Sequence, residues 1–334
     1  MDVGVARDGR SGTVRHGRIG IDVGGTKCLG VLVDDEGSVA AEDRRPTPKG
    51  AANLVATVTE LAAHLRDRAA GAVTFGVGLP GSITRQGVLT SSPHLPGVVD
   101  FDAAGAFTAA LGRPVAVAND ATCAALAEWL LGGGRGVDDM VMITMGTGIG
   151  GGIVAGGHLL LGANGYAGEF GHMMIDPNGR DCPCGQRGCW ERYASGSAIA
   201  LEAMRLAGEG FLDAVVAEAG AAEAITSELV VRAAAAGDVD AATVLDHFAR
   251  WMATGLANLT NAFDPARFVL GGGLVQAAPV FEPMLRRHVA ALVYASNLRP
   301  QPEIRFAELG ERAGAIGAAL FGARRDRERT SASE

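Results

Sequence analysis

Short apolar runs that end in glycine or in a polar pair recur along the chain, and stretches with helical spacing separate them. The runs are IGIDV at 19–23, VTFGVGLPG at 73–81, VAVAND at 115–120, MVMITMG at 140–146 and FVLGGG at 268–273. Apolar runs of this length, bounded by turn residues, predict buried strands. Between the first two, Leu54, Val58, Leu61 and Leu65 are spaced for one face of a helix over residues 50–70. The pattern predicts an α/β protein.

The first predicted strand runs into a glycine turn and then a second strand, CLGVLV, which predicts a β-hairpin. The turn contains the candidate anion-binding residues Asp22, Gly24, Gly25, Thr26 and Lys27. The glycines let backbone N–H groups approach an anion, and Lys27 adds a positive charge. The spacing is not that of a Walker A loop. An ordinary hairpin turn remains the alternative.

Two further glycine turns follow predicted strands, one at Gly146, Thr147 and Gly148 and one at Gly272. The G-x-G-x-x-G spacing from Gly146 to Gly151 also occurs in dinucleotide-binding proteins. There, however, the motif opens a helix. Here the residues after Gly151 lead into another apolar strand, so a second phosphate-binding turn is favoured. A separate backbone turn, at Gly81, ends a buried strand on the side where open α/β sheets bind ligands.

Asn119 and Asp120 stand between a predicted strand and a helix that begins ATCAALAEWL. Asp120 can be interpreted as the cap of that helix. It can also be interpreted as a general base, because the helix dipole favours the ionised carboxylate that a base requires. The two interpretations are compatible.

Residues 168–191 concentrate the candidate metal chemistry. Cys182, Cys184 and Cys189 form a C-x-C-x4-C array, and His172 is the nearest candidate for a fourth ligand. Three cysteines and one histidine make a closed, four-coordinate set typical of structural zinc. A disulfide with a spare thiol is the alternative, but a chain without a secretory signal is expected among reduced thiols.

Two carboxylates flank this segment. Glu169 precedes His172 by three residues, and Glu191 follows Cys189 by two. A zinc-held loop would fix both carboxylates in place, where they can accept hydrogen bonds from hydroxyl groups of a polyol or sugar. His172 would serve twice, with one ring nitrogen on zinc and the other on a sugar hydroxyl.

Composition limits the classes of function. The chain has 334 residues, of which 48% are hydrophobic and 20% charged, and a net charge of −8. This length favours two domains. The negative charge argues against nucleic-acid or membrane partners. No apolar run approaches the length of a spanning helix, and no secretory signal opens the chain, which predicts a cytoplasmic protein.

The motifs IDVGGTK, AND, TMGTGIGGG, GEFGH and CPCGQRGCWERYASG occur in this order. From about Arg18 to Arg324 the chain resembles the ROK family of sugar kinases, and CWERYASG is most similar to the family's bacterial glucokinases. The resemblance implies a two-domain ribonuclease H-like fold of the actin, hexokinase and heat-shock ATPase superfamily, with a catalytic cleft between the domains. It implies a small α/β domain over 18–118 and a larger one over 119–309 that carries the zinc segment. The polar, unpatterned residues 1–17 predict a mobile tail, and residues 325–334 a second tail. The helix over 310–324 would pack back on the small domain.

The resemblance also implies an ATP-dependent glucokinase that uses Mg²⁺ and contains structural Zn²⁺. Asp120 would be the base, and Gly81, His94, Asn119, Glu169, His172 and Glu191 would hold the sugar. The three glycine turns would bind ATP. The chain departs from the family at His94 and Val98, where family glucokinases usually carry asparagine and an aromatic residue, so the preferred hexose stays open.

Two alternatives remain. The family also phosphorylates fructose, allose, N-acetylglucosamine and N-acetylmannosamine, and it includes sugar-responsive regulators without catalysis. ROK repressors carry a helix-turn-helix module ahead of this core, and residues 1–17 are too short for one. We expect a homo-oligomer, either a dimer or a tetramer.

Overall fold

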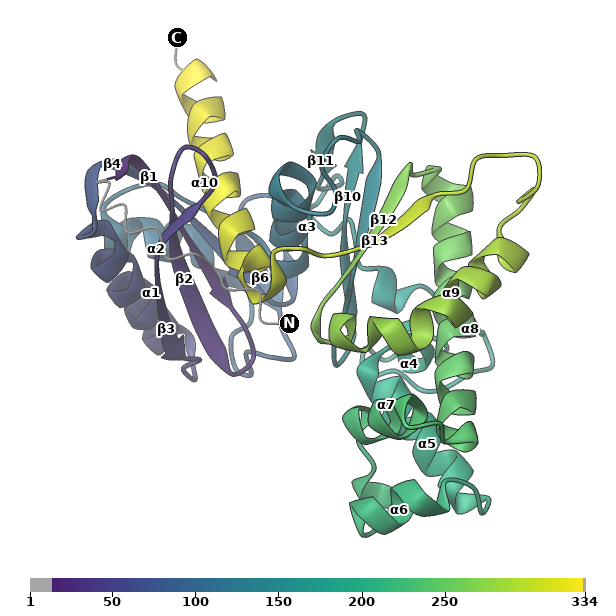
Figure 1. Ribbon diagram of the computed structural model, residues 1–334. Coiled ribbons are helices and arrows are strands. Elements are labelled where there is room, and N and C mark those ends of the chain that lie inside the picture. Colours follow the sequence, from purple (N-terminus) through teal and green to yellow (C-terminus); the bar gives the residue numbers. More distant parts are fainter. Residues whose placement is uncertain (1–13, 333–334) are drawn as a thin grey trace, which may run out of the picture. The chain divides into compact units, whose positions relative to one another are not determined.

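The computed structural model describes residues 14–332 and divides into two compact units (Figure 1). Unit 1 ends at Asp120 and resumes at Ala315, and unit 2 spans Ala121–Gly314. The α/β class predicted from the alternating pattern is confirmed. Most of the tail predicted over 1–17 lies outside the described residues. Its last four residues belong instead to a strand that begins at Val14.

Unit 1 is built around a five-stranded sheet of order β3-β2-β1-β4-β8. Its larger elements are β1 (Val14–Val23), β2 (Lys27–Val33), β3 (Val39–Pro46), α1 (Ala51–Arg66), β4 (Ala69–Leu79), α2 (Ala103–Leu111), β8 (Val115–Asn119) and α10 (Ala313–Ala332). The short strands β5 (Ser82–Ile83), β6 (Val88–Ser91) and β7 (Phe101–Asp102) form a separate small sheet. Leu54, Val58, Leu61 and Leu65 of α1 are all buried, as their spacing predicts.

Three parallel strands of unit 1 end at one edge of the sheet. Asp22 at the end of β1 is paired with Gly78 of β4, and Leu79 at the end of β4 is paired with Asn119 of β8. Loops at the carboxyl ends of parallel strands are the usual place for ligands. The register thus brings the turn after β1, the turn at Gly81 and the Asn119–Asp120 pair to the same edge.

Helix α10 lies directly against the sheet of unit 1. A side chain on Gly20 of β1 would collide with the carbonyl oxygen of Ala315, and one on Gly76 of β4 with that of Ala318. The glycines let helix and strand backbones touch. The tail predicted over 325–334 is wrong through Ala332, because α10 continues to that residue. Ion pairs such as Arg324–Glu328 and Arg329–Asp326 support its last turns.

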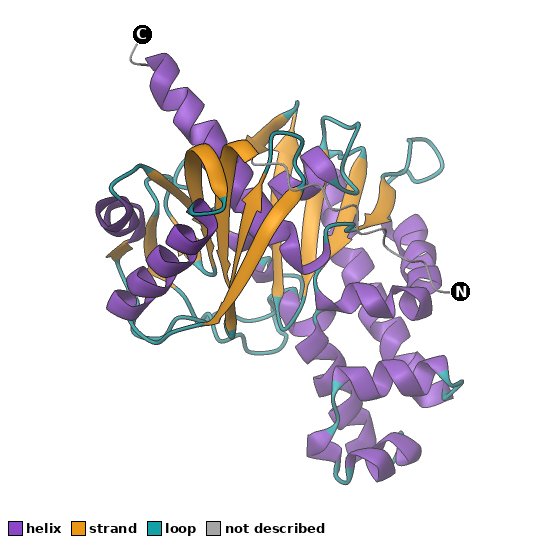
Figure 2. Ribbon diagram, turned by 60° about the vertical axis from the view of Figure 1, so that its left-hand side comes forward, coloured by secondary structure: helices purple, strands orange, loops and turns teal. Residues whose placement is uncertain are grey.

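Unit 2 combines a second five-stranded sheet, of order β11-β10-β9-β12-β13, with a set of helices (Figure 2). The strands are β9 (Met140–Met145), β10 (Ile149–Ala155), β11 (His158–Leu160), β12 (Arg267–Gly271) and β13 (Glu303–Phe306). The helices are α3 (Asp120–Leu131), α4 (Glu191–Ala194), α5 (Gly196–Gly208), α6 (Asp213–Ala219), α7 (Ser227–Ala235), α8 (Val239–Phe263) and α9 (Ala278–Leu292). Short 3-10 turns are η1 (Phe170–His172), η2 (Ala222–Ala224), η3 (Gly273–Ala277) and η4 (Gly310–Arg312).

A buried tryptophan anchors the cysteine-rich segment to the core of unit 2. The Trp190 side chain is fully buried, and its indole N–H donates to the carbonyl oxygen of Trp251 at 2.8 Å. The ring lies on Gly255 of α8, where any side chain would overlap it. Because Trp190 stands between Cys189 and Glu191, this packing fixes the position of both neighbours. Within residues 14–332, the helices are too short or too polar to cross a membrane.

Candidate active site

The turn between β1 and β2 is held by its own backbone and by Thr47. The Gly24 N–H donates to the Lys27 carbonyl at 2.8 Å, and the Thr47 hydroxyl donates to the Gly24 carbonyl at 2.6 Å. Gly25, Thr26 and Lys27 are exposed. The turn is therefore rigid at its base and open at its tip, as an anion-binding turn requires.

Asp22, just before this turn, has an unusual carboxyl group. The residue is partly accessible, but its Oδ1 is buried and accepts no hydrogen bond from any described residue. Burial raises the pKa of Asp22 to about 7. The nearby Asp120 carboxylate adds to this rise, and Lys27 opposes it. An unpartnered carboxylate oxygen beside a second carboxylate is a suitable ligand for a hard cation such as Mg²⁺.

The predicted sugar residues of unit 1 lie at the same sheet edge. The Asn119 amide donates to the Gly81 carbonyl at 3.1 Å. Gly81 has a φ of 109°, and a side chain there would collide with Ser91, so only glycine fits. Asp120 is half-buried at the first position of α3. The exposed His94 ring lies against Gly25, 3.3 Å from where a Cβ would stand.

In unit 2 the second and third glycine turns are neighbours. The turn at Gly146 closes with an N–H to carbonyl bond to Gly148 at 3.0 Å, and Gly196 N–H donates to the Gly146 carbonyl at 2.8 Å. Gly272 has a φ of 88°, and a side chain there would collide with the backbone of Met145. Because β12 runs parallel to β9, both turns leave the sheet at the same edge.

A cavity of about 830 Å³ opens beside these turns, entirely within unit 2. Gly146 and Thr147 line it, as does Gly273, the neighbour of the predicted Gly272. The predicted Gly148 is not part of the lining. Helices complete the wall with mixed apolar and polar residues, among them Ser197, Ala200, Ile225, Thr226, Ser227, Glu228, Val231, Leu274, Gln276 and Val280. The volume and lining suit a nucleotide-sized ligand.

Sequence reasoning missed the helical wall of this cavity. Thr226 carries a recognisable signal, since its hydroxyl accepts the Leu229 N–H and caps α7. That signal predicts a helix start and says nothing of a ligand. The wall forms because α5, α7 and η3 come together in the fold. The spacing of residues within one element cannot predict such a contact between elements.

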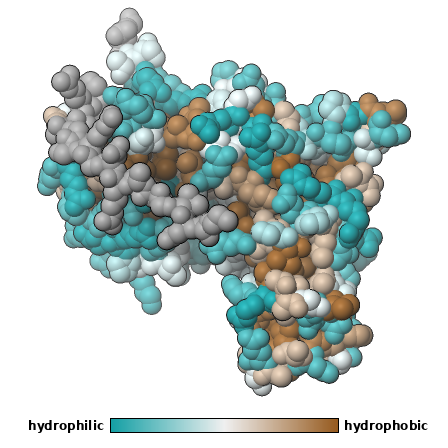
Figure 3. Space-filling view, in the orientation of Figure 1, coloured by the Kyte–Doolittle hydropathy of each residue, from teal (hydrophilic) through white to brown (hydrophobic). Residues whose placement is uncertain are grey.

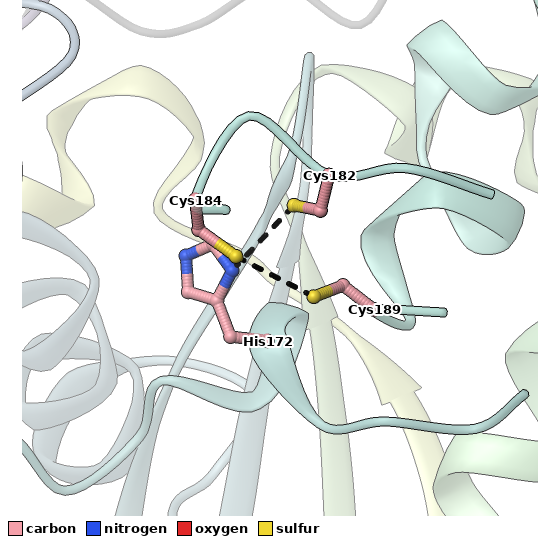
Figure 4. Close-up of side chains that lie close together, drawn as sticks. All are labelled: His172, Cys182, Cys184 and Cys189. Carbon is pink, nitrogen blue, oxygen red and sulfur yellow. Dashed lines mark hydrogen bonds between the residues drawn. The ribbon is translucent and has the colours of Figure 1, made fainter. Parts of the chain in front are cut away.

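The four predicted zinc ligands come together (Figure 4). Their ligand atoms all lie within 4.8 Å of one another. The Cys184 and Cys189 sulfurs are 3.6 Å apart, and the Cys182 sulfur is 4.0 Å from His172 Nδ1. Around a tetrahedral ion with Zn–S bonds of about 2.3 Å, neighbouring sulfurs stand roughly 3.8 Å apart. The donor set and its spacing therefore fit zinc.

The thiols are in their reduced form in this arrangement. Burial, with the side-chain hydrogen bonds to Cys184, Cys189 and Glu191, raises the pKa of Cys182 to about 12. A cation in the centre of the cluster would reverse this effect, because a coordinating thiol gives up its proton. Since Nδ1 of His172 faces the sulfurs, Nε2 is the ring nitrogen left for another partner.

Glu191 lies next to the cluster and to the second glycine turn. Its Oε1 is 3.4 Å from the Cys182 sulfur and 3.9 Å from His172 Nδ1, and its Oε2 faces Gly148. Glu169 is exposed as a residue, yet partial loss of solvation at its carboxyl raises its pKa. His172 opposes this rise, and Glu191 adds to it. The two predicted sugar carboxylates of unit 2 thus share one environment with His172.

Paired α/β units, each with a glycine turn at the carboxyl ends of its strands, define a protein of the sugar kinase, actin and heat-shock ATPase class. The ROK family model matches residues 18–324, and the chain belongs to the ROK family. The resemblance stated from the motifs is confirmed.

Three relatives illustrate the range of this family. The glucokinase of Streptomyces coelicolor is 36% identical over 309 residues, 90% of this chain and 96% of its own. The crystal structure of a ROK family glucokinase from Streptomyces griseus, in complex with glucose and AMPPNP, superposes with a TM-score of 0.80 at 33% identity. That match covers 92% of this chain and 99% of the other. The xylose repressor of Bacillus subtilis is 27% identical over 90% of this chain and 75% of its own.

Proposed function

We propose that the protein is an ATP-dependent glucokinase. The observation that carries this proposal is the position of Glu191, which contacts both the Cys182–His172 cluster and Gly148 of a phosphate-type turn. A carboxylate fixed at this place can grip a sugar hydroxyl directly beside the phosphates of a nucleotide. The similarity to glucokinases over nearly the whole chain supports glucose as the sugar.

In the proposed reaction, Asp120 accepts the proton of the glucose 6-hydroxyl while O6 forms a bond to the γ-phosphorus. The bond from that phosphorus to the β,γ-bridging oxygen breaks, and ADP leaves. Asn119, His94 and the backbone at Gly81 are proposed to bind sugar hydroxyls. The same role is proposed for Glu169, Glu191 and Nε2 of His172. Such fixed partners align the 6-hydroxyl for attack and exclude water from its place.

The glycine turns would hold the nucleotide. Phosphate contact is the role proposed for the turn at Gly24, Gly25, Thr26 and Lys27 and for the turns at Gly146, Thr147, Gly148 and Gly272. The cavity beside Gly146 accommodates the nucleoside. Asp22 would hold Mg²⁺, which neutralises developing phosphate charge when bound. Its buried, unpartnered Oδ1 is the feature that fits this role.

Zinc has a structural role in this proposal. All four cluster ligands come from protein, which leaves no open position for a catalytic water. The ion would keep His172 and Glu191 in place, as ligands and their neighbours orient one another around metals.

The test is a coupled assay of ADP release with purified protein across a panel of hexoses. Glucose-dependent ADP release with the highest kcat/KM for glucose supports the proposal. A higher kcat/KM for fructose, allose, N-acetylglucosamine or N-acetylmannosamine would establish another hexokinase of the family. Sugar binding without any ADP release would favour the regulator, the alternative that the similarity to a xylose repressor keeps open.

The predicted homo-oligomer also remains a proposal, as does the cytoplasmic location. Apolar side chains are exposed just after α9, with Tyr294 at 76% and Leu298 at 83% exposure. Figure 3 shows hydrophobic residues at the visible surface of unit 2. Apolar surface of this kind supports a subunit interface. Light scattering coupled to size exclusion distinguishes a monomer from a dimer or a tetramer.

A further inference from the structure

The zinc loop, residues 176–188, has little core of its own. Apart from Cys182 and Gly188, its residues are exposed or half-buried. The Gly188 N–H donates to the Arg180 carbonyl at 2.8 Å, which pairs the two sides of the loop. Ordering an exposed loop costs conformational entropy, and few apolar contacts offset that cost here. The loop therefore depends on contacts with the rest of unit 2.

Arg180 joins the zinc loop to α4 at three points. Its backbone N–H donates to the Tyr193 hydroxyl at 2.7 Å, and its guanidinium lies 5.0 Å from the centre of the Tyr193 ring. The guanidinium also donates to the Arg192 carbonyl at 3.0 Å. Tyr193 is buried and packs on the ring of Trp251 in α8, with ring centres 4.6 Å apart. Arg180 is thus attached to a part of unit 2 that the core already fixes.

Glu202 of α5 supplies a fourth contact. Its side chain is 14% exposed, and its Oε2 accepts a hydrogen bond from the Arg180 guanidinium at 2.5 Å. Burial would raise the pKa of this carboxyl, but hydrogen bonds from Arg205, Arg180 and His247 lower it to about 2. The carboxylate is therefore charged at neutral pH. Its bond to Arg180 is charge-assisted, and such bonds are stronger than those between neutral groups.

These contacts act on the metal cluster through short stretches of chain. Cys182 follows Arg180 by two residues, so the position of Arg180 limits where that sulfur can lie. On the other side of the loop, Gly188 is bonded to the Arg180 carbonyl and directly precedes Cys189. Two of the three thiols are therefore held near the cluster by contacts that do not involve an ion.

We propose that Arg180 is a positioning residue that anchors the zinc loop to α4 and α5, so that the three thiols stay close to His172 before an ion binds. The proposal rests on the structural role proposed for zinc. A preorganised site loses less entropy when its ligand binds, and its affinity is higher for that reason. Without the Arg180 anchor, the ion itself would have to order the loop, and zinc would bind more weakly.

The first test measures zinc affinity by competition with a chromophoric chelator, using the full chain in its reduced form. Arg180→Met removes the guanidinium hydrogen bonds and keeps an apolar stem on the Tyr193 ring. We expect its zinc affinity to fall roughly 10- to 100-fold, the scale of partners that support metal ligands. Arg180→Lys should recover part of this loss, because it keeps a cation for Glu202. The melting temperature of the zinc-loaded variants should stay close to that of the wild type, since the ion then orders the loop.

Arg205→Met is the matched control. Arg205 also pairs with Glu202, at 2.9 Å, but it stands on α5 and not in the zinc loop. The substitution and the acidic partner are the same, so only the attachment of the loop differs. Zinc affinity of this control should stay within about twofold of the wild type, because a surface ion pair contributes little. The proposal is overturned if Arg180→Met binds zinc as tightly as the control, or if the control loses as much affinity as Arg180→Met.

Hydrogen exchange of the zinc-free protein tests the anchor without the ion. Peptides from residues 176–188 should exchange slowly in the wild type and in Arg205→Met, and roughly tenfold faster in Arg180→Met, because local opening then costs less. One common exchange rate in all three proteins would rule the anchor out.

If Arg180→Met fails to fold, Glu202→Gln takes its place. Glutamine keeps the shape of the side chain and removes the charge that Arg180 pairs with. Zinc affinity and exchange should shift in the same direction as expected for Arg180→Met. Wild-type values for both would contradict the proposal.

The outcomes separate this proposal from the proposed function. A wild type that contains no zinc as purified would contradict the metal role, and the exchange comparison would still decide the Arg180 anchor. Absence of ADP release with every hexose would remove the kinase function, while the zinc affinities and exchange rates would decide the anchor as before.

Discussion

Glu191 Oε2 lies 2.5 Å from the point where a β-carbon would stand on Gly148. Such a contact is shorter than any real Cβ contact, so this approach requires glycine. The relationship joins a carboxylate assigned to the sugar with a turn assigned to the phosphates. The φ of Gly148 is not positive, so backbone conformation does not require glycine at this position. The close approach of Glu191 does.

Gly148→Ala should therefore displace the Glu191 carboxylate. We expect kcat/KM for glucose to fall by roughly a hundredfold, the scale of a misplaced catalytic group, with little loss of stability. Steady-state kinetics and thermal unfolding measure the two effects. Gly208→Ala is the control, because a side chain at that glycine of α5 would meet no atom within 4 Å. If Gly148→Ala showed wild-type kinetics, Glu191 would have no role in sugar binding.

Asp120→Asn tests the base. Asparagine also caps helices well, so stability should change little. Loss of a general base lowers rates by roughly 10² to 10⁴, and kcat should fall by that factor. Asp102→Asn is the matched control, since Asp102 caps α2 by accepting the Gly105 N–H. Turnover near the wild-type value in Asp120→Asn would leave Asp120 as a helix cap only.

Local sequence signals predicted the strands and the zinc-type cluster because both depend on short-range spacing. Cys182, Cys184 and Cys189 lie within eight residues, and the turns between them require glycine, as at Gly185 and Gly188 with φ of 89° and 70°. The strand ends at Asp22 and Asn119 follow from apolar runs that stop at polar residues.

Other features could not be predicted because they depend on segments that are far apart. Glu128 lies in an apolar helical run and reads as a solvent-facing residue, yet Glu308 and Leu309 supply two of its three donors. The pKa of Asp22 is raised first by burial and then by Asp120, which reaches the same edge only through the β1-β4-β8 register. Contacts of this kind arise from the tertiary fold and cannot be predicted from the spacing of nearby residues.

Asp22 predicts a pH dependence of stability. Its pKa rises from 3.8 to about 7, so the folded state holds this proton more tightly than the unfolded state. The contribution of the Asp22 proton to the free energy of unfolding is fully present below pH 3.8 and is lost as pH rises through about 7. The difference between the two pKa values corresponds to roughly 4 kcal/mol in the free energy of unfolding. Asp22→Asn should therefore be more stable than the wild type at pH 8.5 by up to that order, and similar to it near pH 4.

Urea unfolding with a chelator at both pH values measures this difference. Asp35→Asn is the control, because Asp35 is exposed and should show no such trend. Added Mg²⁺ should recover wild-type stability at pH 8.5 and have no such effect on Asp22→Asn, if the ion binds Asp22. A stability difference that is the same at both pH values would contradict the raised pKa.

Zinc content distinguishes a metal cluster from a set of packed thiols. Elemental analysis should find about one zinc per chain in the wild type and almost none in Cys189→Ser, which removes one of the four ligands in the cluster. Cys123→Ser should keep its zinc, because Cys123 is buried on α3 outside the cluster. Without zinc, Glu191 and His172 lose their fixed partner, so glucose affinity should fall by roughly 10- to 100-fold while the ATP analogue still binds. A zinc-free wild type that binds glucose with unchanged affinity would mean that Trp190 packing alone holds Glu191 in place.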